Sequence, residues 1–204
     1  MKPYVGPAPL YNFLRTCESS PLEKVVLDCG AGGPRPPLAL FAQQGYEAHG
    51  VELSEERLRQ AQDFARASAL DLHLLHGDLR ALPYTDTSIS FAYTFNTIFH
   101  LPKEEMARGL QEIARVLKPG GLCFANLLSV DDGEYGAGEE VGPGEFLQEE
   151  HGGKSLHSYF EDDEADGYFE GWSLLRREKR VLQLWVEGTR YPGAMIDYIV
   201  RKPH

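Results

Sequence analysis

Apolar runs alternate with helix-like segments along the first part of the chain. Residues 24–29, 46–53 and 72–75 are mostly apolar runs with the length of buried strands. Residues 38–44 follow two prolines suited to a helix start, and residues 55–69 follow a serine suited to an N-cap, so both are predicted helices. Strands that alternate with helices at this spacing predict βαβ units and a mostly parallel sheet.

The alternation continues as far as residue 128. Residues 88–95 predict a fourth strand and residues 122–128 a fifth. The segment 103–117 between them predicts a helix, because its apolar residues recur close to a 3.6-residue period. The Lys-Pro-Gly-Gly sequence at 118–121 is expected to end that helix as a turn.

The pattern changes after residue 129. Segment 129–154 is rich in Asp, Glu and Gly and has few β-branched residues, so it is expected to form a long loop. We interpret residues 129–160 as a lid over the edge of the sheet. Beyond it we expect a short acidic helix near 161–168 and two strands around 172–186 and 194–201.

A single domain is expected to hold all of residues 1–204. This length suits one good-sized domain with a single core, and the sequence has no internal repeat. Residues 1–23 contain three prolines within the first nine positions, followed by a short amphipathic stretch. We interpret them as an N-terminal cap on the fold.

Charge and cysteine content narrow the class of protein. A net charge of −11 argues against binding to nucleic acid or to an anionic membrane, because both need clustered Lys and Arg. No apolar run has the length of a transmembrane helix, and the first residues lack the apolar stretch of a signal peptide. Cys17, Cys29 and Cys123 are too widely spaced for a disulfide framework or a zinc site. We therefore expect a cytoplasmic protein with no bound metal.

The most informative motif is Val-Val-Leu-Asp-Cys-Gly-Ala-Gly-Gly at residues 25–33. The predicted strand reaches Asp28, and glycines follow at positions 30, 32 and 33. Because glycine has no Cβ, such a turn can reverse sharply and let a ligand lie close to the backbone. A strand that leads through a glycine-rich turn into a helix is typical of the nucleoside- or phosphate-binding corner of an α/β sheet.

Carboxylates also stand at the ends of the next two predicted strands. Glu52 ends the second strand and Asp78 follows the third, so with Asp28 three consecutive strand ends supply an acid. Open α/β sheets bind ligands at this edge, where Glu52 could accept bonds from ribose hydroxyls and Asp78 from an adenine amino group. Each acid alone could instead form a turn or cap a helix. The three together favour a nucleoside site.

These motifs resemble those of the class I S-adenosylmethionine-dependent methyltransferases. The resemblance implies an α/β fold, a Rossmann-like three-layer sandwich with a seven-stranded, mostly parallel sheet whose last strand is antiparallel. It also implies S-adenosylmethionine as the cofactor and a small molecule as the methyl acceptor. It covers roughly residues 20–130 and rests, in order, on Asp28–Gly33, Glu52, Gly77-Asp78, the fourth strand and the turn at 118–121.

The resemblance also implies which residues bind the cofactor. The methionine part would lie against the turn at Gly30 and Gly32, and the ribose on Glu52. The adenine would lie near Asp78, and the loop that starts at Asn96 would border the reactive methyl group. The full implied set is Asp28, Gly30, Ala31, Gly32, Glu52, Leu53, Asp78, Leu79 and Asn96.

One residue departs from the family's pattern. The third glycine of the turn would fall at position 34, which is Pro34 here, whereas Gly33 stands one residue earlier. Proline fixes φ and has no N–H. The contacts after Gly32 are therefore expected to differ, while the class of cofactor is not affected.

The acceptor side offers several candidates and no single catalytic residue. Methyl transfer can be catalysed largely by positioning, and only a protonated acceptor requires a general base. Histidine is the usual base because its pKa lies near neutrality, although each histidine here could be structural. The candidates are His100 after the fourth strand, and His157 with Tyr159 in the lid, where His151 also lies.

Two other functions stay open on the sequence alone. An NAD(P)-dependent oxidoreductase would share the glycine turn, but the full Gly-x-Gly-x-x-Gly pattern is missing because position 35 is Arg35. A non-catalytic S-adenosylmethionine-binding regulatory protein would have lost its acceptor site. No Asn/Asp-Pro-Pro-Tyr/Phe sequence follows the fourth strand and no Pro-Cys pair stands there, which disfavours methylation of amino groups on adenine or of cytosine.

Overall fold

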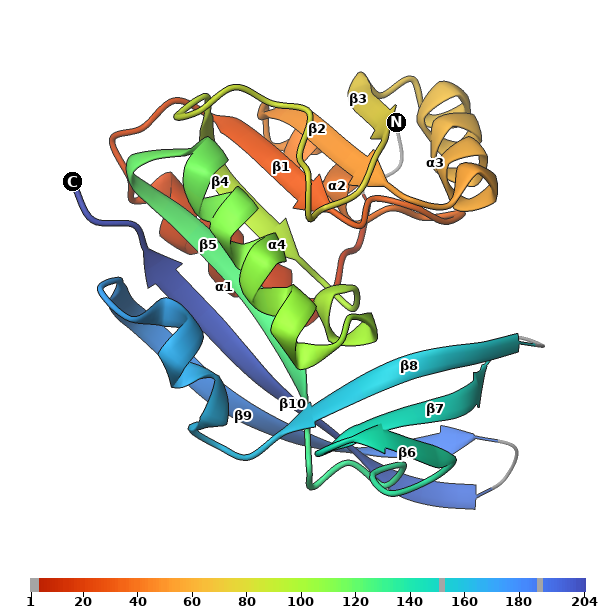
Figure 1. Ribbon diagram of the computed structural model, residues 1–204. Helices are drawn as coiled ribbons and strands as arrows, with labels where there is room; N and C mark the ends of the chain where they lie inside the picture. The colour runs from red at the N-terminus through yellow and green to blue at the C-terminus, as the bar shows by residue number, and fades with distance from the viewer. Residues whose placement is uncertain (1–3, 151–152, 187–188) are drawn as a thin grey trace.

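The computed structural model describes residues 4–150, 153–186 and 189–204. The strands form a ten-stranded sheet with helices on both of its faces (Figure 1). The main part of the sheet contains the strands β3 (Leu72–His76), β2 (Glu47–Glu52), β1 (Val25–Cys29), β4 (Ile89–Thr94), β5 (Leu117–Ser129), β10 (Thr189–Arg201) and β9 (Ser173–Val186), in this order.

Strand direction confirms the predicted α/β architecture. The strands β3, β2, β1, β4 and β5 pair in parallel, whereas β10 runs antiparallel to both β5 and β9. The chain moves outward from β1 to β3 in one direction and from β4 to β5 in the other. The connections that leave β1 and β4 therefore diverge, which creates a crevice at the carboxyl ends of these strands.

Helices cover both faces of the sheet, with one hydrophobic core on each side. The helices α1 (Ala8–Glu18) and α2 (Leu38–Gln43) bury their apolar sides in one core. The helix α4 (Lys103–Val116) and the 3-10 helix η2 (Glu164–Phe169) contribute to the other core. The helix α3 (Glu55–Ser68) packs beside β3 and β2. Within the described ranges, every helix is too short or too polar to cross a membrane.

The predicted long loop at 129–154 is wrong. The chain forms an antiparallel meander, in which β6 (Glu139–Gly142), β7 (Glu145–Glu150) and β8 (Gly153–Phe160) follow one another. Its last strand, β8, pairs in parallel with the end of β5, so the sheet has more strands than the seven expected. Strand formation depends more on pairing and burial than on intrinsic preference, which explains why an acidic sequence adopts it.

Other boundaries differ from the prediction by a few residues. The strand β5 starts at Leu117, so the segment 118–121 forms an irregular first part of this strand, where the register against β4 shifts. The strand β10 begins at residue 189, because its first residues pair with β9. The acidic helix expected near 161–168 is the 3-10 helix η2.

Phe13 fixes α1 to the sheet. It is fully buried, and its ring centroid lies 5.8 Å from that of Phe124 and 6.3 Å from that of Tyr93. Phe13→Ala should lower the free energy of unfolding by about 3–5 kcal/mol, because it removes a large buried side chain and leaves a cavity. Urea denaturation followed by circular dichroism measures this change.

Arg15→Ala is the matched control on the exposed side of the same helix. It should change the free energy of unfolding by less than about 0.5 kcal/mol. If Phe13→Ala gave a change as small as this control, α1 would not belong to the cooperatively folding core.

Candidate functional site

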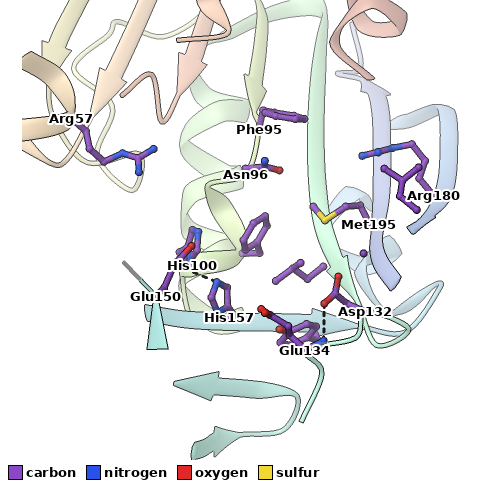
Figure 2. Close-up of a pocket in the computed structure, with 15 residues that line it drawn as sticks. Arg57, Phe95, Asn96, His100, Asp132, Glu134, Glu150, His157, Arg180 and Met195 are labelled. Atoms are coloured by element: carbon purple, nitrogen blue, oxygen red, sulfur yellow. Dashed lines mark hydrogen bonds and ion pairs between the residues drawn. The ribbon is translucent and has the colours of Figure 1, made fainter. Parts of the chain in front are cut away.

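Two adjoining cavities open at the carboxyl edge of the sheet. The smaller cavity has a volume of about 310 Å³ and lies at the ends of β1 and β2. The larger cavity, drawn in Figure 2, has a volume of about 550 Å³ and lies between the loop after β4, the meander and β10. The cavities share a boundary, because Arg57, Asn96, His100 and Glu150 line both of them.

The glycine turn after β1 approaches β2 closely. The backbone N–H groups of Gly30 and Ala31 both donate to the carbonyl oxygen of Val51, at 2.8 Å and 3.0 Å. Gly30 has a φ of +120°, and a Cβ there would lie 2.1 Å from Thr97 Oγ1. Only glycine fits this position, and the close approach holds the turn against the loop that follows β4.

The residue after the glycines does not disturb this turn. Pro34 is exposed to solvent, and Gly33, immediately before it, donates its N–H to the carbonyl oxygen of Arg57 at 2.8 Å. Proline has no N–H group, and at this exposed position the turn does not need one.

Glu52 presents its carboxylate to the smaller cavity from the end of β2. The side chain is mostly buried; Oε1 accepts a hydrogen bond from the backbone N–H of Ser54 at 2.8 Å, and Oε2 lies 4.0 Å from Arg57 Nε. A Cβ on Gly32 would lie 2.2 Å from Oε2, so this position must lack a side chain for the carboxylate to stand where it does.

Asp78, Leu79 and Leu53 form the other predicted part of the smaller cavity. Arg80 donates hydrogen bonds from Nε and Nη2 to the Asp78 carboxylate. The shorter contact, between Nη2 and Oδ2, is 2.6 Å. This guanidinium lowers the pKa of Asp78, so the carboxylate is ionised at neutral pH. Leu79 is buried beside it, whereas Leu53 is exposed.

Three predicted residues lie behind the cavities. Among the described side chains, Asp28, Ala31 and Gly32 are not part of either cavity lining. Asp28 is 1% exposed; its Oδ2 accepts a hydrogen bond from the Tyr93 hydroxyl at 2.8 Å, and its Oδ1 has no hydrogen-bond partner in the described structure. Burial raises the pKa of Asp28 to about 8, against the lowering effect of the Tyr93 hydrogen bond.

Asn96 lies at the boundary of the two cavities in a strained conformation. Its φ is +52°, which is uncommon for a residue other than glycine. Two hydrogen bonds to the buried Asn126 maintain it, one from the Asn96 N–H at 2.8 Å and one to the Asn96 Oδ1 at 2.7 Å. The strain is located where the two cavities meet.

The three acceptor-side candidates, His100, His157 and Tyr159, all line the larger cavity. Figure 2 shows His100 and His157 side by side there. The ring centroids of the two histidines lie 4.8 Å apart. Tyr159 is almost fully buried, and its hydroxyl donates to Gln148 Oε1 at 3.0 Å; burial raises its pKa. His151 lies outside the described residues.

Burial lowers the pKa of both histidines, so they are neutral at physiological pH. For His100 the neighbouring His157 adds to this lowering, while the Leu156 carbonyl, 3.0 Å from Nδ1, opposes it. For His157 the Glu150 carboxylate opposes the effect of burial, with Oε2 lying 3.6 Å from Nε2.

Sequence reasoning did not find Glu150 or Arg57. Glu150 is one acid in an acidic segment, and Arg57 is an ordinary exposed residue of α3, so nothing in the local pattern distinguishes either. Both become part of the site only because the meander and α3 bring them to the boundary of the two cavities.

A crevice at the diverging connections of a parallel sheet, with a glycine turn and a carboxylate at the end of β2, is typical of nucleoside-binding α/β proteins. The family described as "Methyltransferase domain" matches residues 26–121. Methyltransferase GfsG of Streptomyces halstedii is 32% identical over 106 residues, which cover 50% of this chain and 37% of that protein. The chain thus spans less than half the length of this curated relative.

Solved structures resemble almost the whole chain. A S-adenosylmethionine-dependent methyltransferase from Methanosarcina mazei has a TM-score of 0.76 at 20% identity, over 98% of this chain and 99% of that one. The 1,6-didemethyltoxoflavin-N1-methyltransferase of Burkholderia thailandensis, solved with S-adenosylhomocysteine, has a TM-score of 0.67 at 17% identity, over 97% and 78%. At these identities the likeness shows the fold. The family model covers residues 26–121, fewer than half of the residues of this chain, and the solved structures show that almost the whole chain has the fold of these methyltransferases.

The raised pKa of Asp28 makes stability depend on pH. Between about pH 4 and pH 8 the folded protein keeps a proton on Asp28 that the unfolded chain releases. This group therefore makes the free energy of unfolding fall as pH rises, by up to about 1.4 kcal/mol per pH unit in that window. Asp28→Asn keeps an acceptor for Tyr93 and cannot ionise, so its stability relative to the wild type should increase steadily from pH 5 to pH 8.

Urea denaturation of both proteins at several pH values measures this difference. Glu56→Gln, which alters an exposed carboxylate of α3, is the control and should follow the wild-type pH profile. Parallel profiles for Asp28→Asn and the wild type would mean that Asp28 is already ionised in the folded protein.

Proposed function

We propose that this protein transfers a methyl group from S-adenosylmethionine to a small-molecule acceptor. The observation that carries the proposal is the junction of two cavities at one sheet edge. The smaller cavity is lined by six of the nine residues that the resemblance implies for the cofactor, namely Gly30, Glu52, Leu53, Asp78, Leu79 and Asn96. The larger cavity adjoins it at Asn96 and His100. A donor in the first cavity and an acceptor in the second would therefore meet at this boundary.

The smaller cavity fits the cofactor in chemistry and size. Its Glu52 carboxylate can accept hydrogen bonds from ribose hydroxyls. Leu53 and Leu79 supply apolar surface for the adenine ring. A Cβ at Gly30 would collide with Thr97, so the absence of a side chain here lets the turn and Thr97 together line this cavity. A volume of about 310 Å³ is within the range of cavities that bind small molecules.

The larger cavity has the size and lining of a small-molecule site. It combines aromatic and apolar side chains with the carboxylates of Asp132, Glu134 and Glu150. Strands β7 and β8 supply part of its wall, which supports the interpretation of residues 129–160 as a lid over the acceptor. One structural neighbour is named for methylation of 1,6-didemethyltoxoflavin at N1, which is methylation of a small molecule. The net charge of −11 supports a partner other than nucleic acid.

The residues of the site would act mainly by positioning. Bound S-adenosylmethionine supplies an electrophilic methyl group on a positively charged sulfur. Asn96, held by Asn126, fixes the loop where donor and acceptor meet, so the two reactants can be aligned at little entropic cost. Where the acceptor carries a proton, the neutral imidazoles of His100 and His157 are placed to take part in its removal.

We further propose that the protein works as a single domain in the cytoplasm. Cys17, Cys29 and Cys123 are all buried and unpaired, which suits a reducing compartment. The helix α1, in the segment 1–23, closes one face of the sheet as a cap would.

Glu52→Gln should weaken binding of S-adenosylmethionine by about 10- to 100-fold, because it replaces a charged hydrogen-bond acceptor with a neutral amide of the same shape. Isothermal titration calorimetry with S-adenosylmethionine and S-adenosylhomocysteine measures the effect. Glu56→Gln is the matched control, because Glu56 lies on the exposed side of α3, and it should bind like the wild type.

The same titrations test the alternatives. Binding of NADH in place of either ligand would favour an oxidoreductase, and binding of none of them would refute the methyltransferase proposal. Tight binding without turnover across a broad panel of hydroxyl, amine and thiol acceptors would favour a non-catalytic cofactor-binding protein.

A further inference from the structure

Three potential metal ligands converge between the two cavities. His100 ends the 3-10 helix η1 (Ile98–His100), Glu150 ends β7, and His157 lies on β8. One nitrogen of each histidine and one carboxylate oxygen lie within 4.8 Å of one another. Figure 2 shows the three side chains pointing toward one another at one end of the larger cavity.

The hydrogen bonds of His100 prepare it as a ligand. Its Nδ1 lies 3.0 Å from the carbonyl oxygen of Leu156, which can only accept a hydrogen bond, so Nδ1 carries the proton. The lone pair of the ring therefore resides on Nε2. A histidine that binds a metal commonly donates its other ring N–H to a backbone carbonyl in this way, which fixes both tautomer and ring orientation.

One ring nitrogen of His157 is buried without a hydrogen-bond partner among the described residues. The side chain is 8% exposed, Nε2 faces the Glu150 carboxylate, and the nitrogen without a partner is Nδ1. A buried polar atom without a partner costs about 1–3 kcal/mol. An ion bound at Nε2, beside the Glu150 carboxylate, would leave Nδ1 as it is.

The spacing is close to that of a coordinated ion. Ligand atoms at about 2.0–2.1 Å from one tetrahedral ion lie roughly 3.3 Å from each other. His157 Nε2 and Glu150 Oε2 are already 3.6 Å apart, and the whole set lies within 4.8 Å. Glu150 and His100 are only partly buried, so rotation of their side chains can bring the three ligand atoms closer together.

We propose that His100, Glu150 and His157 bind a divalent transition-metal ion of the zinc class and that its open position receives a hydroxyl oxygen of the acceptor. Two imidazoles and one carboxylate are a donor set of catalytic zinc sites, in which a fourth position stays open for water or substrate. This position would lie where the cavities adjoin, because His100 and Glu150 line both. This proposal departs from our sequence-based expectation of no bound metal.

The chemical consequence rests on the proposed methyl transfer. An ion bound to the acceptor hydroxyl would lower its pKa, so that the O–H proton passes to water. The oxygen lone pair then forms the new bond to the methyl carbon, while the S–CH₃ bond breaks and its electron pair stays on sulfur. The acceptor class is therefore an alcohol or phenol.

Zinc binding tests the site without any acceptor. The full chain, freed of metal with a chelator, is titrated with Zn²⁺ in a calorimeter and with Co²⁺ in a spectrophotometer. We expect one tight site per chain with the visible absorption of four-coordinate Co²⁺. His157→Gln and His100→Gln should each weaken this binding roughly 100-fold, because each removes one of three protein ligands.

His73→Gln is the matched control. His73 is an exposed histidine of β3 outside both cavities, so its loss should leave the tight site unchanged. Binding of S-adenosylhomocysteine by each variant shows that the variant is folded. Absence of Zn²⁺ binding, or binding that is indifferent to His100→Gln and His157→Gln, would overturn the metal site. Zinc binding in a protein that binds no S-adenosylmethionine would instead refute the proposed function and leave the metal site standing.

Discussion

The close approach of the β1–α2 turn to the end of β2 is the constraint on which the site depends. Two consecutive N–H groups, of Gly30 and Ala31, share the carbonyl oxygen of Val51. A side chain at Gly30 would strike Thr97, and one at Gly32 would strike the Glu52 carboxylate. Three segments can therefore meet in a small volume only because the turn has no side chains between them, and their meeting forms the wall of the smaller cavity.

This packing has an electrostatic cost that a cationic ligand would offset. Asp28 is buried just behind the turn, and Glu52 is largely buried beside it, so burial and the Glu52 charge both raise the pKa of Asp28. A positively charged group near Asp28 would favour its ionised form. The same charge pattern would hold a sulfonium donor more tightly than its neutral product.

The sequence predicted the lining of the smaller cavity better than that of the larger one. Residues at the ends of parallel strands must share one edge of the sheet, so Glu52, Asp78 and Asn96 could be placed there from strand order alone. Which residues line the cavity could not be predicted, since Asp28 and Ala31 occupy the same motif and yet lie behind its wall. Around the larger cavity, the acidic composition of the meander concealed its strands, which are stabilised by pairing with one another and, for β8, with the end of β5.

Local periodicity, helix signals and the glycine turn predicted the order of strands and helices along the chain and the parallel sheet, because these patterns depend on residues that are neighbours in sequence. Tertiary structure alone decided the acceptor cavity. The contact from His100 to the Leu156 carbonyl joins residues 56 positions apart, and it forms only once the meander pairs with the end of β5. No local pattern records such a pairing, because its stability comes from burial and cross-strand contacts that exist only in the folded chain.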